Sequence, residues 1–203
     1  MFWTAPCRLI LASASAARRQ VLASAGLAFE VMPAAIDERA LERGVRAGGG
    51  TPADGAAALA RAKAAQIAAG QPDALVLGCD QVLEIEGATL SKPRNRDEAL
   101  AQLLALRGRA HLLHSAMALE GALGQPWLHV ETVTLKMRGF TDDFAETYLD
   151  AAGGAALTSL GAYQYEGLGA HLFDAADGSH TAIMGLPLLA LLARLRAIKA
   201  LMS

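Results

Sequence analysis

Short apolar runs alternate along the chain with longer segments of helical periodicity, and this alternation predicts an α/β fold. The run RLILA at residues 8–12 predicts a first strand, which small residues connect to a helix over residues 16–24. Thr51 then precedes an alanine-rich segment that predicts a helix over residues 53–69. The apolar run ALVLGC at residues 74–79 predicts a buried strand.

The rest of the chain continues the same pattern. Further helices are predicted over residues 96–106, 141–150 and 187–199. Further strands are predicted over residues 29–32, 81–85, 110–119, 128–136, 162–165 and 170–173. Because no repeat and no linker divides the sequence, we expect one domain over residues 1–203.

Composition and charge narrow the class of protein. The 203 residues are 53% hydrophobic, which is enough for a sizeable core and excludes disorder. The 18 basic and 20 acidic residues give a net charge of −2, so no bulk basic field favours nucleic acid, although a small anion could still meet a local basic cluster. Two cysteines without a CxxC motif argue against a disulfide scaffold and a cysteine zinc site.

No membrane or export segment is expected. The longest apolar run, residues 182–193, contains Gly185 and Pro187 and is shorter than the roughly 20 residues of a spanning helix. Residues 1–12 lack the basic start of a secretory signal, and two thiols suit a reducing compartment. We therefore expect a cytoplasmic protein.

The first candidate for chemistry is the small loop after the first strand. Ser13 and Ser15 lie between a strand and a helix, where free N–H groups and the positive end of the helix dipole can bind an anion. Arg18 can add forked hydrogen bonds to phosphate. The same residues also suit an ordinary N-cap beside a solvated pair of arginines.

Several acidic and basic residues are further candidates for a catalytic or binding role. Glu38 ends the triplet IDE, which can hold Mg²⁺ through water or can be a plain polar loop. Asp80 directly follows a buried strand, the place where ligands gather in open α/β sheets. Lys63 lies inside the alanine-rich helix, where a lysine ordinarily extends its ammonium to solvent, and Lys92 lies in a turn. The segment YQYEG, which contains Glu166, can read a base edge or can be a hairpin turn with exposed tyrosines.

These segments occur together in one order: LILASASAARRQVLASAGLAFEV, IDE, ARAKA, LGCDQVLEIEG, SKP, GAYQYEGLGAHLF and GLPL. The ordered set runs from Arg8 to Leu195 and resembles the Maf family of nucleoside triphosphate pyrophosphatases. The resemblance implies a two-lobed α/β fold with a mixed sheet, similar to inosine triphosphate pyrophosphatases, with the nucleotide in a central cleft. It also implies hydrolysis of a nucleoside triphosphate to the monophosphate and pyrophosphate, a divalent cation such as Mg²⁺, Mn²⁺ or Co²⁺, and a homodimer.

Under this resemblance each candidate residue takes a role in the reaction. Asp80 is the expected general base, the proton acceptor for the attacking water, and Glu38 is the expected metal ligand. The groups expected to neutralise and hold the triphosphate are Ser13, Ser15, Arg18, Lys63 and Lys92.

The specificity positions resemble the branch of the family assigned to 7-methyl-GTP. The branch assigned to dTTP and UTP has Thr where this chain has Gln81, and Gln where it has Glu166. A carboxylate can accept from both N1–H and the 2-amino group of guanine, whereas a pyrimidine edge places one donor between two acceptors. Ala16 and Ala17 depart from the family pattern of Pro and a specificity residue, and Ala17 can neither stack on a base nor donate to one.

Three alternatives stay open at this point. The chain could be a dTTP or UTP pyrophosphatase of the same family, a non-catalytic regulator of septum formation, or a nucleotide-binding module without turnover. The presence of Asp80 together with Lys63 and Lys92 favours an enzyme, because a pure binding protein needs no base.

Overall fold

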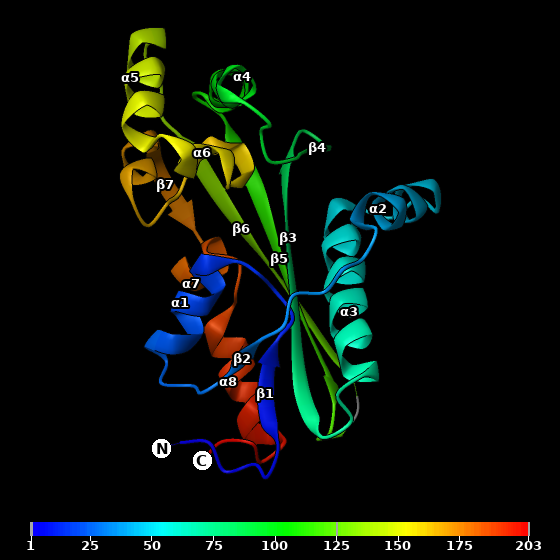
Figure 1. The fold of residues 1–203 in the computed structure, drawn as a ribbon. Coiled ribbons are helices and arrows are strands. Elements are labelled where there is room, and N and C mark those ends of the chain that lie inside the picture. The colour runs from blue at the N-terminus through cyan, green and yellow to red at the C-terminus, as the bar shows by residue number, and fades with distance from the viewer. Residues whose placement is uncertain (1, 125, 203) are drawn as a thin grey trace. The chain divides into compact units, whose positions relative to one another are not determined.

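The computed structural model describes residues 2–124 and 126–202 (Figure 1). The strands are β1 (Arg8–Leu11), β2 (Glu30–Val31), β3 (Ala74–Ile85), β4 (Ala88–Leu90), β5 (Ala110–Gly121), β6 (Trp127–Met137) and β7 (Phe173–Asp177). The helices are α1 (Ala16–Ser24), α2 (Glu38–Ala47), α3 (Pro52–Ala69), α4 (Arg96–Leu106), α5 (Asp142–Ala152), α6 (Gly154–Leu157), α7 (His180–Ile183) and α8 (Leu188–Ala197). Two short 3₁₀ helices are η1 (Leu160–Ala162) and η2 (Leu168–Leu172).

The strands of the described residues form a mixed sheet, which confirms the predicted α/β class. Their order is β2-β1-β3-β5-β6-β7, and β4 pairs with β3 outside this path. Strand β1 pairs in parallel with β2 and β3, whereas the β3–β4 and β6–β7 pairs are antiparallel.

The described residues divide into two compact units, in agreement with the two-lobed fold that the resemblance implies. The first unit comprises residues 2–81, 115–131 and 179–202, and the second comprises residues 82–114 and 132–178. The expected single domain over residues 1–203 and the expected nucleotide cleft stay predictions.

The core of the first unit lies on one face of β1 and β3. Leu9 of β1 and Leu75 and Leu77 of β3 belong to the same buried cluster as residues of α1 and α8. Since side chains alternate along a strand, these odd-numbered residues of β3 share a face, and the even-numbered ones face the other way. Figure 1 shows α1, α7 and α8 on one side of these strands and α2 and α3 on the other.

Helix α3 packs very closely on the second face of β3. A Cβ atom at Gly78 would lie 2.2 Å from the carbonyl oxygen of Ala60 and 2.9 Å from Cβ of Ala64, so only glycine fits at this position. Both alanines are fully buried. Asp80 lies two residues beyond Gly78 and therefore on the same face, next to a helix whose small side chains permit the close approach.

Side-chain caps explain why several elements lie where the sequence predicts them. The Thr51 hydroxyl accepts from the N–H of Asp54 at 3.2 Å, and the Asp54 carboxylate accepts from the N–H of Thr51 at 2.8 Å, which fixes the start of α3. Thr141 caps α5 in a simpler way by accepting from the N–H of Phe144 at 3.2 Å.

The prediction of two strands, over residues 162–165 and 170–173, is wrong. Gly161 and Ala162 have φ values of +68° and +62°, which are incompatible with extended backbone, and the segment forms η1, a turn and η2 instead. Nor is the segment a hairpin with exposed tyrosines, since Tyr163 is only 5% exposed.

Candidate active site

Arg18 is held at the start of α1 by groups from three other segments. Ser15 caps the helix by accepting from the Arg18 N–H at 3.4 Å. In the side chain, Nε donates to the carbonyl oxygen of Gly185 at 2.9 Å, and Nη1 donates to Ser13 Oγ at 3.1 Å and to the carbonyl oxygen of Cys79 at 2.9 Å. The side chain is therefore buried and fixed in one orientation.

The charge of Arg18 has no carboxylate partner among residues 2–124 and 126–202. Because its hydrogen bonds use Nε and Nη1, the two donors of Nη2 remain for a further ligand. The first-turn N–H groups of Ala16 and Ala17 also lack an acceptor within the helix. A buried cation beside a helix N-terminus is suited to bind an anion such as a phosphate.

Lys63 of α3 joins two carboxylates instead of extending to solvent. Its Nζ lies 2.5 Å from Oδ1 of Asp80 and 2.6 Å from Oε1 of Glu38. Lys63 and Asp80 are 9% and 7% exposed. The close packing of α3 on β3 thus brings Lys63 next to Asp80, and α2, which contacts α3, adds Glu38, so the lysine is engaged with carboxylates.

The environment of Asp80 suits a proton acceptor. Burial raises the pKa of Asp80, and the positive charges of Lys63 and Arg18 oppose this rise. The raised pKa makes the carboxylate a stronger base, while the two cations favour its ionised form. A further carboxylate, Glu42, is near enough to interact: burial raises the pKa of Glu42, and the charges of Asp80 and Glu38 raise it further.

Glu38 and Glu42 belong to α2, a helix that the sequence analysis does not predict. Asp37 caps this helix by accepting from the N–H of Ala40 at 2.9 Å, so its carboxylate has a structural partner. The signal was present in the sequence, because an Asp followed directly by a Glu is typical of a helix start.

The residues present fit a divalent cation of the magnesium type. Oxygen atoms of Glu38 and Asp80 converge on one point, the Lys63 ammonium, and carboxylate oxygen is the ligand that Mg²⁺ prefers. In the described part of the chain, no three His, Cys, Asp or Glu side chains are grouped so that they alone could hold a metal. An ion bound here would therefore take its other ligands from water and phosphate.

Two neighbours of Asp80 in β3 are also fixed by the fold. Gln81 is half-buried, and its Nε2 donates to carbonyl oxygens at the end of α7 and to Ser115. Cys79 is fully buried, and burial raises the pKa of its thiol to about 11. The thiol stays protonated at neutral pH, so Cys79 packs as a buried apolar side chain and is not a nucleophile.

The remaining predicted site residues, Ala17, Lys92 and Glu166, are more exposed to solvent than Arg18, Lys63 and Asp80. Ala17 is half-buried and packs against the hydrophobic core of the first unit, so part of its surface is not available to a base. Lys92 and Glu166 are exposed and belong to the second unit, Lys92 just after β4 and Glu166 in the turn before η2.

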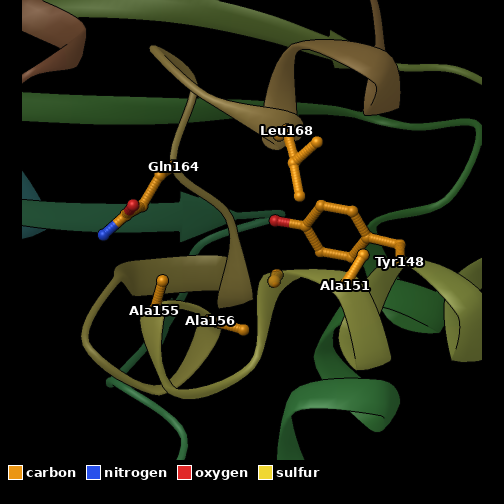
Figure 2. A pocket seen from close by; sticks show the side chains of 8 residues that line it. Tyr148, Ala151, Ala155, Ala156, Gln164 and Leu168 are labelled. Atoms are coloured by element: carbon orange, nitrogen blue, oxygen red, sulfur yellow. The ribbon is translucent and has the colours of Figure 1, made fainter.

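The second unit has a pocket that none of the predicted site residues lines. Figure 2 shows it between α5, α6 and the segment before η2, with alanine side chains around the Tyr148 ring. The Tyr148 hydroxyl donates to the carbonyl oxygen of Ala162 at 3.2 Å. The pocket is mostly apolar and carries no charged side chain among its lining residues.

No helix in residues 2–124 and 126–202 has the length and the hydrophobicity that crossing a bilayer requires.

Known proteins are similar to this chain over most of its length. The family model described as Maf-like protein matches residues 8–198. A Rhizobium meliloti protein named 7-methyl-GTP pyrophosphatase is 48% identical over 193 residues, which are 95% of this chain and 97% of the relative. A Nitrobacter winogradskyi protein named nucleoside triphosphate pyrophosphatase is 48% identical over 195 residues, 96% of each chain. A Granulibacter bethesdensis protein of the same name is 45% identical over 194 residues, 96% of this chain and 98% of the relative.

The match to the family model covers nearly the whole chain, and it includes both units and every residue of the candidate site. The chain therefore belongs to the Maf family.

Proposed function

We propose that this Maf-family enzyme, a nucleoside triphosphate pyrophosphatase, hydrolyses 7-methyl-GTP to 7-methyl-GMP and pyrophosphate. The observation that carries the proposal is Arg18, a buried cation that forms no ion pair with a carboxylate in the described part of the chain and whose charge still acts on Asp80. A polyanion supplies the missing negative charge, and Asp80 supplies the base that hydrolysis needs. The name of the Rhizobium meliloti relative, 7-methyl-GTP pyrophosphatase, supports 7-methylguanine as the nucleobase of the substrate.

The reaction places water on the α-phosphorus while pyrophosphate leaves. Arg18 holds the phosphates through Nη2, with help from the first-turn N–H groups of Ala16 and Ala17, while Ser13 and Ser15 fix the arginine and the start of the helix. Asp80 takes the proton from the attacking water, and Lys63 keeps its carboxylate ionised and directed. In this assignment Lys63 acts on the chemistry through Asp80 and Glu38, which are its contacts.

Glu38 is the residue that would hold the divalent cation, beside Asp80 and Lys63. When bound, such an ion neutralises negative charge on the phosphate oxygens. Lys92 keeps its role from the sequence, as a further cation for the triphosphate.

Glu166 and Gln81 are assigned to recognition of the nucleobase. Both can accept hydrogen bonds from guanine, which presents N1–H and a 2-amino group. The positive charge of the methylated ring further favours a nearby carboxylate. Ala17 supplies no stacking surface, so the preference for guanine over pyrimidine is expected to be larger than that for the methylated over the plain base.

The test is a panel of nucleoside triphosphates that includes 7-methyl-GTP, GTP, dTTP and UTP, assayed for pyrophosphate with Mg²⁺, Mn²⁺ and Co²⁺ in turn. We expect the highest kcat/KM with 7-methyl-GTP. Faster release from dTTP and UTP would assign the chain to the other branch. A nucleotide-dependent thermal shift without pyrophosphate would identify a binding module or a regulator. Homodimerisation, a cytoplasmic location and the absence of nucleic-acid binding stay predictions from the sequence.

A further inference from the structure

The side-chain amide of Gln81 is held in one orientation. Its Nε2 lies 2.8 Å from Ser115 Oγ, 3.1 Å from the carbonyl oxygen of Ala182 and 3.0 Å from that of Ile183. Carbonyl oxygens only accept, so the amide nitrogen must face them, and a flipped amide would set oxygen against oxygen. Oε1 is therefore left as the acceptor that Gln81 can offer to a ligand.

Ser115 reinforces this orientation. It is fully buried in β5, and its Oγ donates to the carbonyl oxygen of Ala182 at 2.6 Å. A hydroxyl has one proton, so Oγ can meet the Gln81 amide only as an acceptor. The serine thus joins Gln81 to the end of α7 and excludes the opposite amide orientation.

The same segment also holds Arg18. We name residues 179–185, which contain α7, the α7 corner. Its last residue, Gly185, accepts from Arg18 Nε at 2.9 Å. Gly185 has φ +86°, which favours glycine, and a Cβ atom there would lie 3.0 Å from Arg18 Nε, so it would push the Arg18 side chain aside.

The α7 corner is itself anchored at its other end. Ser179 caps α7 by accepting from the N–H of Ala182 at 3.2 Å. The Ser179 hydroxyl donates to Oε1 of Glu131 in β6 at 2.6 Å, and its N–H donates to the same oxygen at 3.2 Å. The carbonyl groups that face Arg18 and Gln81 therefore belong to a fixed turn.

We propose that the α7 corner is a positioning element that sets Gln81 as the acceptor for the base and Arg18 as the donor for the phosphates, with Ser115 and Gly185 as positioning residues. The identity of the ligand rests on the proposed function, since a guanine-type base presents the donors that Oε1 of Gln81 requires. The proposal has two arms: the base arm comprises Ser115 and Gln81, and the phosphate arm comprises Gly185 and Arg18. They are measured differently, because every nucleotide has the same phosphates but a different nucleobase.

The base arm is tested with Ser115→Ala and with Ser115→Thr, which keeps the hydroxyl. We expect Ser115→Ala to reduce the ratio of kcat/KM for 7-methyl-GTP over UTP by about 3–10-fold, the effect of one neutral hydrogen bond. Ser115→Thr is expected to retain most of the ratio. The Gln81 side-chain amide gives a readout that does not need turnover: its NMR signals, assigned with Gln81→Leu, should be protected from solvent exchange in the unmutated protein and lose protection in Ser115→Ala.

The phosphate arm is tested with Gly185→Ala against Gly26→Ala. Both glycines have positive φ, +86° and +68°, but a Cβ atom at Gly26 meets nothing within 4 Å. The backbone strain is therefore comparable, and only Gly185→Ala displaces Arg18. We expect Gly185→Ala to lower kcat/KM about 10–100-fold for every nucleotide, as for a charged hydrogen bond, and Gly26→Ala to change it little.

The outcomes separate this inference from the proposed function. If the unmutated protein releases no pyrophosphate from any nucleotide, the proposed function is wrong. The NMR signals of the Gln81 amide would still test the positioning role of the α7 corner. An active unmutated protein whose base selectivity and Gln81 protection survive Ser115→Ala would overturn the base arm. Equal losses in Gly185→Ala and Gly26→Ala would overturn the phosphate arm.

Discussion

In the described part of the chain, each unit buries two basic side chains, Arg18 and Lys63 in the first and His111 and His114 in the second. Of these, Arg18 and His111 are stabilised in opposite ways. Arg18 of the first unit keeps its charge and donates to two carbonyl oxygens and a hydroxyl. His111 of the second unit is 2% exposed and packs against Tyr163 and Phe173, and burial lowers its pKa to about 4. The imidazole is therefore neutral at neutral pH, and its Nε2 lies 2.7 Å from the Tyr163 hydroxyl.

The difference in charge between Arg18 and His111 indicates which of the two buried side chains binds a ligand. A buried charge is unfavourable unless it is paired, and a histidine avoids the penalty by losing its proton. An arginine cannot do so, and Arg18 has no carboxylate partner in the described chain. Arg18 and Asp80 should thus govern activity, and His111 should govern stability.

The largest expected effect is on catalysis. Asp80→Asn keeps the shape of the side chain and removes the base, so pyrophosphate release should fall about 10²–10⁴-fold with little change in nucleotide affinity. Asp73→Asn makes the same chemical change at an exposed position just before β3 and should leave kcat unchanged. Full activity in Asp80→Asn would remove Asp80 from the chemistry.

The second effect is on stability in acid. The unfolded chain protonates His111 below about pH 6.5 and the folded chain only below about pH 4. The unfolded state therefore binds more protons in this window, and the free energy of unfolding should fall by up to about 3 kcal/mol as the pH drops through it.

His111→Gln should flatten this dependence while nucleotide hydrolysis at neutral pH persists. Urea unfolding at several pH values measures it, and His171→Gln, an exposed histidine of the same unit, is the control that should keep the slope. An unchanged slope in His111→Gln would assign the acid sensitivity to other groups.

The third effect tests the charge of Arg18. Arg18→Ala should lower kcat/KM for all nucleotides by about 10–100-fold, because a charged contact to the shared phosphates is lost. Inorganic tripolyphosphate should raise the melting temperature of the unmutated protein and not that of Arg18→Ala. Arg19→Ala removes an exposed arginine next in the chain and should behave like the unmutated protein. A loss confined to one base would instead place Arg18 at the base.

The smallest effect concerns base choice in the second unit. Glu166→Gln should admit UTP and dTTP and reduce the preference for guanine by about 3–10-fold, since the amide offers a donor as well as an acceptor. Asp174→Asn removes another exposed carboxylate of this unit and should not alter the preference. Equal changes in both variants would indicate a general charge effect.

The sequence by itself determined the elements that local signals define. Caps such as Thr51 and Thr141 are satisfied by neighbours three residues away, so the pattern alone locates the helices. Continuous apolar runs likewise identify β1 and the first half of β3, and they place Asp80 directly after the second run. Motif order was enough to identify the family and the candidate residues Ser13, Arg18 and Asp80.

Only the tertiary structure decided which groups meet. Lys63 contacts Asp80 because a glycine and small alanines let α3 approach β3, a fact about two distant segments that no local pattern contains. Arg18 depends on Gly185, which lies 167 positions away along the chain, and Gln81 depends on carbonyl groups about 100 positions away. Hydrogen bonds of this kind follow from how helices pack on the sheet, so the sequence gives the residues and the fold gives their partners.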